Sequence, residues 1–327
     1  MTAASPTPAD TSATQEQQVK PAVLVTGADL APEALALLTD YRVVYAGQKP
    51  SEQDIVNLCR DYNPMAIIVR YGKVGAPAMD AAPALRVISK HGSGTDTIDK
   101  VAAKERHIEV VAAVGANAAA VAEQTLTLLL ACAKSVVELN SRMHTGHWDK
   151  ATHKSLELGG KTLGLIGLGA IGLRTAKMAA AMDMRVIGFD PYAKDLPDDV
   201  QLVELETLWR ESDVISLHCP LTDDNRGLLN ADTLSQCKRG VIIVNTARGG
   251  LIDEQALLDA VRSGQVQMAA LDSFAIEPMV ANHPFQGEKN ILLSPHIGGV
   301  TGAAYVKMGV GAAKNVLAVL ANNAAAR

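Results

Sequence analysis

Three residues suited to acid–base and anion chemistry each follow an apolar run in the second half of the chain. His296 stands in "ILLSPHIGG", Arg248 in "VIIVNTARGG" and Glu277 in "ALDSFAIEP". Imidazole titrates near neutrality, a neighbouring carboxylate favours its protonated form, and a guanidinium matches the two oxygens of a carboxylate. Each residue alone is compatible with an ordinary turn or loop. All three at strand ends that a parallel sheet gathers at one edge indicate proton transfer on a carboxylate-bearing substrate.

A glycine-rich turn precedes these residues. "LGLIGLGAIG" is an apolar run that ends in Gly167-x-Gly169-x-x-Gly172, and the helix-forming segment "LRTAKMAAAM" follows it. This order predicts a dinucleotide whose pyrophosphate lies at the helix N-terminus. Asp190 comes 190 − 172 = 18 residues later, close to the offset of an acid that binds the adenosine ribose. Asp190 would repel a 2′-phosphate, which favours NAD over NADP, although the basic residue Lys194 follows closely. Proteins that bind FAD or S-adenosylmethionine can share the same glycine turn and acidic residue.

The elements that must position these groups alternate regularly along the chain. Short β-branched runs are separated by helix-compatible segments, a long helix is expected from about 118 to 139, and an amphipathic helix from 303 to 320. We predict an α/β fold of two Rossmann-like, doubly wound parallel-sheet domains with a cleft between them. The expected strands are 22–27, 41–47, 66–70, 85–92 and 108–115, then 161–167, 184–190, 213–220, 240–247, 266–273 and 290–296.

Composition excludes several classes of protein. The 327 residues are 48% hydrophobic and 3% aromatic with a net charge of -5, so we expect no nucleic-acid partner. The longest apolar stretches, such as "LTLLLACA", are too short to span a membrane. Residues 1–19 lack the features of a secretory signal and are expected to be a disordered tail. The four cysteines show no C-x-x-C spacing, which predicts a cytoplasmic protein without disulfides or a metal site.

Five segments carry a resemblance to a known family: "GSGTDTID", "GKTLGLIGLGAIG", "NTARGGLIDEQAL", "ALDSFAIEP" and "SPHIGG". With them the chain resembles, from about residue 22 to 320, the D-isomer-specific 2-hydroxyacid dehydrogenases, which include phosphoglycerate dehydrogenases and glyoxylate/hydroxypyruvate reductases. The resemblance implies a substrate domain of residues 20–118 and 302–327, with an NAD-binding Rossmann domain, residues 119–301, inserted in it. It also implies a homodimer formed mainly through the NAD domain.

The same resemblance implies roles for individual residues. His296 would donate and accept the proton, Glu277 would be its hydrogen-bonded partner, and Arg248 would bind the substrate carboxylate and polarise its carbonyl. The substrate would also meet Arg70, Tyr71, Gly72 and the backbone N–H groups of Ser93 and Gly94. The cofactor would contact Gly167, Gly169, Ala170, Ile171, Gly172, Asp190, Cys219, Pro220, Thr246, Ala247, Asp272 and Gly298, with Asp272 holding the nicotinamide carboxamide.

Two questions stay open at this point. Arg70 and Lys90 could bind a second anion such as a phosphate, or they could be solvated charges, so glyoxylate, hydroxypyruvate and 3-phosphohydroxypyruvate are all candidate 2-oxo acids. Glu277 argues against the related formate dehydrogenases, which carry glutamine there. Corepressors of the C-terminal-binding-protein type keep the fold and all three residues. An NAD-sensing interaction module is therefore the alternative to an NAD-dependent D-2-hydroxyacid dehydrogenase.

Overall fold

The computed structural model describes residues 20–325, so the expected tail, residues 1–19, lies outside the described chain. The first half forms a five-stranded sheet in the order β2-β1-β3-β4-β5, and every strand pair is parallel. Its strands are β1 (Ala22–Val25), β2 (Arg42–Tyr45), β3 (Ala66–Val69), β4 (Val87–Lys90) and β5 (Glu109–Ala112). Its helices are α1 (Pro32–Leu35), α2 (Glu52–Tyr62), α3 (Ala76–Asp80) and α4 (Lys100–Glu105).

The second half forms a seven-stranded parallel sheet in the order β12-β11-β10-β9-β6-β7-β8. The strands are β6 (Thr162–Ile166), β7 (Arg185–Phe189), β8 (Val200–Leu202), β9 (Val214–Leu217), β10 (Val241–Asn245), β11 (Val266–Leu271) and β12 (Ile291–Leu293). The helices are α7 (Ala170–Ala180), α8 (Leu205–Glu211), α9 (Ala231–Gln236) and α10 (Glu254–Ser263). Strand order reverses at β6 and β9, where open α/β sheets bind ligands. The predicted fold is confirmed, and the short strand β8 is an addition to it.

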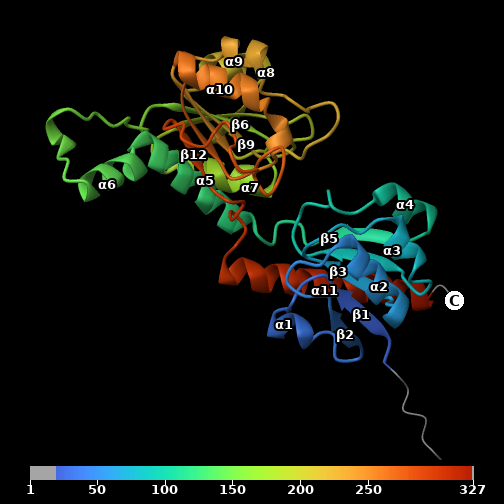
Figure 1. Cartoon of the computed structure of the whole chain (residues 1–327). Helices are drawn as coiled ribbons and strands as arrows, with labels where there is room; N and C mark the ends of the chain where they lie inside the picture. The colour runs from blue at the N-terminus through green and yellow to red at the C-terminus, as the bar shows by residue number, and fades with distance from the viewer. Residues whose placement is uncertain (1–19, 326–327) are drawn as a thin grey trace, which may run out of the picture.

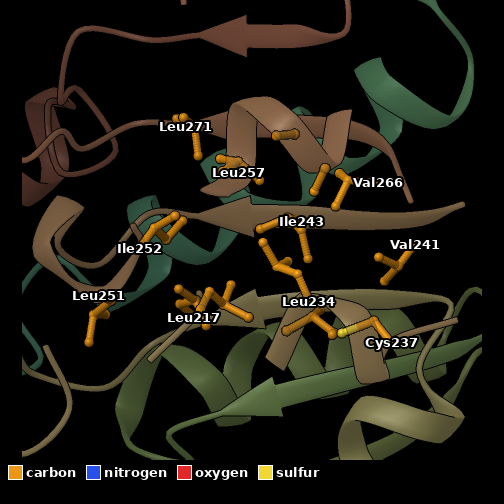
Figure 2. Packing of buried hydrophobic residues seen from close by; sticks show 14 of the residues in the cluster. Leu217, Leu234, Cys237, Val241, Ile243, Leu251, Ile252, Leu257, Val266 and Leu271 are labelled. Atoms are coloured by element: carbon orange, nitrogen blue, oxygen red, sulfur yellow. The ribbon is translucent and has the colours of Figure 1, made fainter. Parts of the chain in front are cut away.

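The central strands are apolar on both faces because helices cover both faces of the sheet. In β10, Val241 and Ile243 enter one hydrophobic cluster while Ile242 and Val244 enter the other. Figure 2 shows the first cluster, in which α10 lays Leu257 against the sheet. Complete burial of one such side chain contributes roughly 1.5–3 kcal/mol. These layers hold the strand ends, and the residues that follow them, in fixed places.

The long helix predicted over 118–139 is wrong, because the structure divides it. α5 (Ala118–Ala133) packs against α7, β10 and β11, and α6 (Val136–His144) continues at a bend of 60°. Ser135 lies between them in the left-handed conformation, φ 50°, which interrupts helical geometry. Ten residues of α5 are buried and none of α6 is, so the bend marks where the chain leaves the core.

The last helix, α11 (Gly302–Ala325), confirms the predicted closing helix and returns to the first sheet. It packs on α1, β3, β4 and β5 and buries Ala312, Ala313 and Val316 completely. Figure 1 shows α11 running across the five-stranded sheet, with α6 extending away from both sheets. By length and composition α11 could span a bilayer, as could the bent α5–α6 pair taken together. Here the apolar side of α11 is core against β4.

Candidate active site

The carboxyl ends of strands from both sheets surround one cavity of about 830 Å³. The first unit lines it with the loops after β3 and β4, and the second with the loops after β6, β9, β10, β11 and β12. The connection into α5 and the first turns of α11 complete the wall. Parallel strands thus gather residues that lie far apart in the sequence at one place.

The glycine loop fits a dinucleotide. A Cβ at Gly172 would lie 2.1 Å from the Gly167 carbonyl oxygen, so only glycine lets the start of α7 pack on the loop. Among the described residues, no atom other than those of Gly169 and its two chain neighbours lies within 4 Å of the place where a Gly169 Cβ would be, so the space in front of the helix N-terminus is open. Ala170 and Ile171 form the first turn of α7 and line the cavity beside Gly169. Unpaired N–H groups at such a terminus attract phosphate.

Asp190 follows β7 directly and lies against the glycine loop. Its Oδ2 accepts a hydrogen bond of 2.8 Å from the Leu168 backbone N–H, and its Oδ1 accepts one of 2.9 Å from Tyr192. Each carboxylate oxygen keeps a second lone pair for another donor. The carboxylate is therefore fixed in orientation beside the loop, as binding of two ribose hydroxyls requires.

His296 and Glu277 form a hydrogen-bonded pair at the cavity. The His296 Nδ1 and the Glu277 Oε2 are 2.7 Å apart, and Glu277 Oε1 accepts a 2.9 Å bond from the Phe274 N–H. The bond from Glu277 raises the pKa of His296 above its ordinary value, against the opposing effect of burial. Burial alone would raise the pKa of Glu277, but the bonds from His296 and Phe274 lower it. The pair thus favours an imidazolium beside a carboxylate.

A buried aspartate holds the loop that carries His296. Asp272 Oδ1 accepts hydrogen bonds from the Ser294 hydroxyl, 2.6 Å, and the Ile297 N–H, 3.0 Å. Its Oδ2 accepts one of 2.8 Å from the Gly298 N–H. His296 itself has a left-handed backbone, φ 54°, which few side chains adopt without such support. Asp272 therefore fixes the position of the imidazole in addition to lining the cavity.

Arg248 reaches across the cavity to the first unit. Its Nε and Nη2 donate to one oxygen of Asp96, at 3.0 and 2.9 Å, and its Nη1 donates to the Ala247 carbonyl at 2.7 Å. The Asn245 side chain bonds the Arg248 carbonyl and the Ala247 N–H, which shapes the turn after β10. A Cβ at Gly94 would lie 1.8 Å from Nη2, so glycine there admits the guanidinium.

Most of the predicted site residues line this single cavity. These are Arg70, Tyr71, Ser93, Gly94, Gly169, Ala170, Ile171, Cys219, Pro220, Thr246, Ala247, Arg248, Asp272, His296 and Gly298. Gly167, Gly172, Asp190 and Glu277 lie just behind the wall, bonded or packed to residues that form it. Gly72 is different, because the site of its missing Cβ is 2.9 Å from Ile55 and so faces the core of the first unit.

Several lining residues were not among the predicted ones. Asp96 lies within the segment "GSGTD", where its charge was the available signal. Tyr305 and Met308 come from α11, and only the return of that helix to the first sheet brings them to the cavity. His91 and His218 also line the wall, but burial lowers the pKa of each to about 4. Both are therefore neutral at pH 7.

Comparisons with known proteins agree with this site. A family model for the D-isomer specific 2-hydroxyacid dehydrogenase NAD binding domain matches residues 126–298. The chain is 43% identical over 240 residues to a hydroxypyruvate reductase of Thermotoga maritima, covering 73% of this chain and 78% of that one. It is 37% identical over 303 residues to a D-3-phosphoglycerate dehydrogenase of Methanocaldococcus jannaschii, covering 91% and 57%. A glyoxylate reductase structure from Paecilomyes thermophila matches with a TM-score of 0.82 at 28% identity, covering 91% and 95%.

Proposed function

Because the chain belongs to the D-isomer specific 2-hydroxyacid dehydrogenase family and is an NAD-dependent oxidoreductase, we propose that it interconverts a small 2-oxo acid and its D-2-hydroxy acid with His296 as acid and base. The observation that carries this proposal is the 2.7 Å bond between His296 and Glu277 on the wall that also holds Arg248. An imidazolium and a guanidinium at one cavity supply the proton and the anion-binding group that the reaction needs.

The side chains divide the work of the reduction. Arg248, with the backbone N–H groups of Ser93 and Gly94, binds the substrate carboxylate and directs its carbonyl oxygen to His296. The cofactor, when bound, would supply a hydride as NADH in reduction and accept one as NAD+ in oxidation. His296 gives its proton to the carbonyl oxygen, and Glu277 stabilises the charged ring before that transfer. Arg248 also meets the negative charge that grows on that oxygen.

In this proposal, residues at the carboxyl edge of the seven-stranded sheet would hold the cofactor. The glycine loop from Gly167 to Gly172 would hold the pyrophosphate, and Asp190 would bind the adenosine ribose and disfavour a 2′-phosphate. Asp272 would hold the nicotinamide carboxamide. The residues assigned to the cofactor surface between these points are Cys219, Pro220, Thr246, Ala247 and Gly298, all of which line the cavity.

The glyoxylate, hydroxypyruvate and 3-phosphohydroxypyruvate type remains the proposed substrate class. The names of the relatives cover all three kinds of substrate, and the alternative of an NAD-sensing interaction module finds no support among them. The experiment is NADH oxidation by the purified protein with glyoxylate, hydroxypyruvate, 3-phosphohydroxypyruvate, pyruvate and bulkier 2-oxo acids, followed by the chirality of the hydroxy acid formed. Turnover to a D product is expected. NADH binding without turnover of any 2-oxo acid would contradict the proposal.

We also propose that the two units are domains that close over the substrate. Residues 20–118 and 302–327 form the substrate domain and residues 119–301 the NAD domain. The packing of α11 on the first sheet and of α5 on the second supports these boundaries. The Arg248–Asp96 pair joins the two units across the cavity. Closure excludes water from the reacting groups.

The proposed homodimer has a candidate surface on α6 and the segment after it. Val136, Val137, Met143 and Trp148 are each more than half exposed. Large apolar side chains that gather on an exposed surface mark interfaces, and Figure 1 shows α6 and the segment after it projecting from the molecule. Val137→Glu is expected to halve the molar mass measured by light scattering, whereas Val101→Glu, exposed on α4, leaves it unchanged. Equal masses for both variants would contradict this surface.

The four free cysteines suit the reducing cytoplasm in which we place the enzyme.

A further inference from the structure

Arg70 lies on the cavity wall with its charge already bound to a neighbouring carboxylate. It follows β3, and only 12% of its side chain is exposed. Its Nη1 donates to the Asp29 backbone oxygen at 2.6 Å and also to the Asp29 carboxylate. Asp29 belongs to the loop after β1, so two neighbouring strand ends form the pair. A guanidinium held in this way is compensated before any substrate arrives.

A third element fixes the same carboxylate. The Tyr305 hydroxyl, from α11, donates to Asp29 Oδ1 at 2.8 Å. The guanidinium of Arg70 lies over the rings of Tyr71 and Tyr305, 5.4 and 5.0 Å from their centroids. The bonds from Tyr305 and then Arg70 lower the pKa of Asp29, while burial and the bond to Asp29 raise the pKa of Tyr305 to about 12. Asp29 is therefore a carboxylate throughout the neutral range.

The backbone just after β1 also makes room for this arrangement. A Cβ at Gly27 would lie 2.9 Å from Cδ of Arg70, so a larger residue there would push the side chain away from Asp29. Segments around residues 27–29, 70–71 and 305 thus meet around one guanidinium. Contacts from three separate segments hold the Arg70 guanidinium in place, and the Asp29 side chain that neutralises it is 67% exposed to water.

The other basic groups of the first unit do not replace the Arg70 charge that Asp29 neutralises. Lys90 Nζ donates to the Arg70 carbonyl at 3.2 Å, burial lowers the pKa of Lys90 to about 8, and Lys90 does not line the cavity. His91 lines it but is neutral, since burial lowers its pKa to about 4. Lys100 lies on the wall at the start of α4, where the negative charge of Asp96 acts on it and on Arg248. A phosphate beside Arg70 would meet the Asp29 carboxylate as well.

We propose that Asp29 is a specificity-determining residue that acts through Arg70: by neutralising this guanidinium it fits the cavity to 2-oxo acids with an uncharged far end and disfavours a phosphorylated one. Hydrogen and hydroxymethyl, as in glyoxylate and hydroxypyruvate, are the substituents that fit. Arg70 and Tyr71 still offer hydrogen-bond donors to a neutral hydroxyl group. This inference rests on the proposed function and narrows its substrate class.

The test compares kcat/KM for hydroxypyruvate and 3-phosphohydroxypyruvate at saturating NADH. The wild-type enzyme is expected to prefer hydroxypyruvate. Asp29→Asn frees the charge of Arg70 and is expected to raise the relative kcat/KM for the phosphorylated acid about fivefold, the effect of one partly exposed ion pair. Tyr305→Phe should shift the ratio the same way but less. Asp40 is an exposed acid that precedes β2, at the amino ends of the parallel strands, whereas Asp29 follows the carboxyl end of β1. Asp40→Asn is therefore the matched control and should leave the ratio of the two kcat/KM values unchanged.

The outcomes separate the inference from the proposed function. A wild-type preference for 3-phosphohydroxypyruvate, or an Asp29→Asn variant that changes both substrates equally, overturns the role of Asp29 while leaving the dehydrogenase reaction in place. Failure to reduce any 2-oxo acid overturns the proposed function itself and the inference with it. The wild-type ratio needs no variant, so a wild-type preference for 3-phosphohydroxypyruvate overturns the inference even where a substitution impairs folding. Inhibition by inorganic phosphate that strengthens in Asp29→Asn gives a second readout of the freed charge.

Discussion

Replacing Asp96 by asparagine should strengthen substrate binding, although Asp96 is bonded to the arginine that we assign to the substrate. Both Nε and Nη2 of Arg248 donate to one oxygen of Asp96, and the guanidinium lies against Gly94. The proposed substrate carboxylate needs the same two donors and the N–H groups of Ser93 and Gly94. Asp96 is therefore a competitor that the substrate must displace from Arg248.

The size of the effect follows from the exposure of the pair. The Arg248 side chain is 32% exposed and that of Asp96 is 56% exposed, so water screens their attraction. Such pairs contribute about 0.5–1 kcal/mol, well below the figure for a buried pair. At 1.4 kcal/mol for each factor of ten, removal of the competitor lowers KM about twofold to fivefold. The value of kcat should change little, because the competition is removed before the transition state forms.

The assay is the KM and kcat of NADH-dependent reduction, together with the inhibition constant of oxamate, which reports binding without turnover. Asp96→Asn should lower both the KM and the inhibition constant by similar factors. Asp61→Asn, an exposed acid of α2, is the control for a change of net charge. A rise in KM with a fall in kcat would refute the reasoning, because Asp96 would then be needed to orient Arg248 during the reaction.

Three further predictions follow from the geometry. Because Glu277 raises the pKa of His296, kcat/KM for reduction should be full at low pH and lost as pH rises through that pKa, and Glu277→Gln should move the loss to lower pH in a pH–rate profile; an unmoved profile would contradict the pairing. Asp190→Asn should weaken NADH binding about tenfold and narrow the preference over NADPH, measured by titration with both cofactors; unchanged affinity for NADH would exclude Asp190 from the ribose site. Leu257→Ala, in the fully buried cluster of Figure 2, should reduce the free energy of unfolding by roughly 2–5 kcal/mol in denaturant titrations, and a loss below about 1 kcal/mol would contradict that packing.

The sequence was sufficient to predict the parts of the fold that repeat. Apolar β-branched runs mark buried parallel strands, and all eleven predicted strands are present. The strand β8 was not predicted because its three residues, Val200, Gln201 and Leu202, are too few to show a pattern. The bend at Ser135 was not predicted because helical periodicity continues on both sides of it. Only the end of the core, where α5 is buried and α6 is not, explains where the helix stops.

In the candidate site, too, some residues could be predicted from the sequence and others could not. His296, Glu277 and Arg248 could be predicted because each follows a strand end, and parallel strands place such ends together. The partners of these residues were less accessible to sequence reasoning. Asp29 is one of many loop acids, and Tyr305 is 276 residues further along the chain. Nothing local connects them to Arg70, since their contact depends on the return of α11 to the first sheet. Sequence patterns thus located the reacting groups, and the charge balance around them required the structure.

The most direct test of the central claim is the comparison of NADH binding and 2-oxo acid reduction in His296→Ala. NADH is expected to bind with unchanged affinity, because we assign His296 to proton transfer and place the proposed pyrophosphate site at Gly169. Reduction of the best substrate should fall by about 10²- to 10⁴-fold, the usual contribution of a positioned acid or base. His153→Ala, which changes a histidine outside the cavity wall, should keep full activity. A His296→Ala enzyme that reduces the substrate at near wild-type rate would contradict the account.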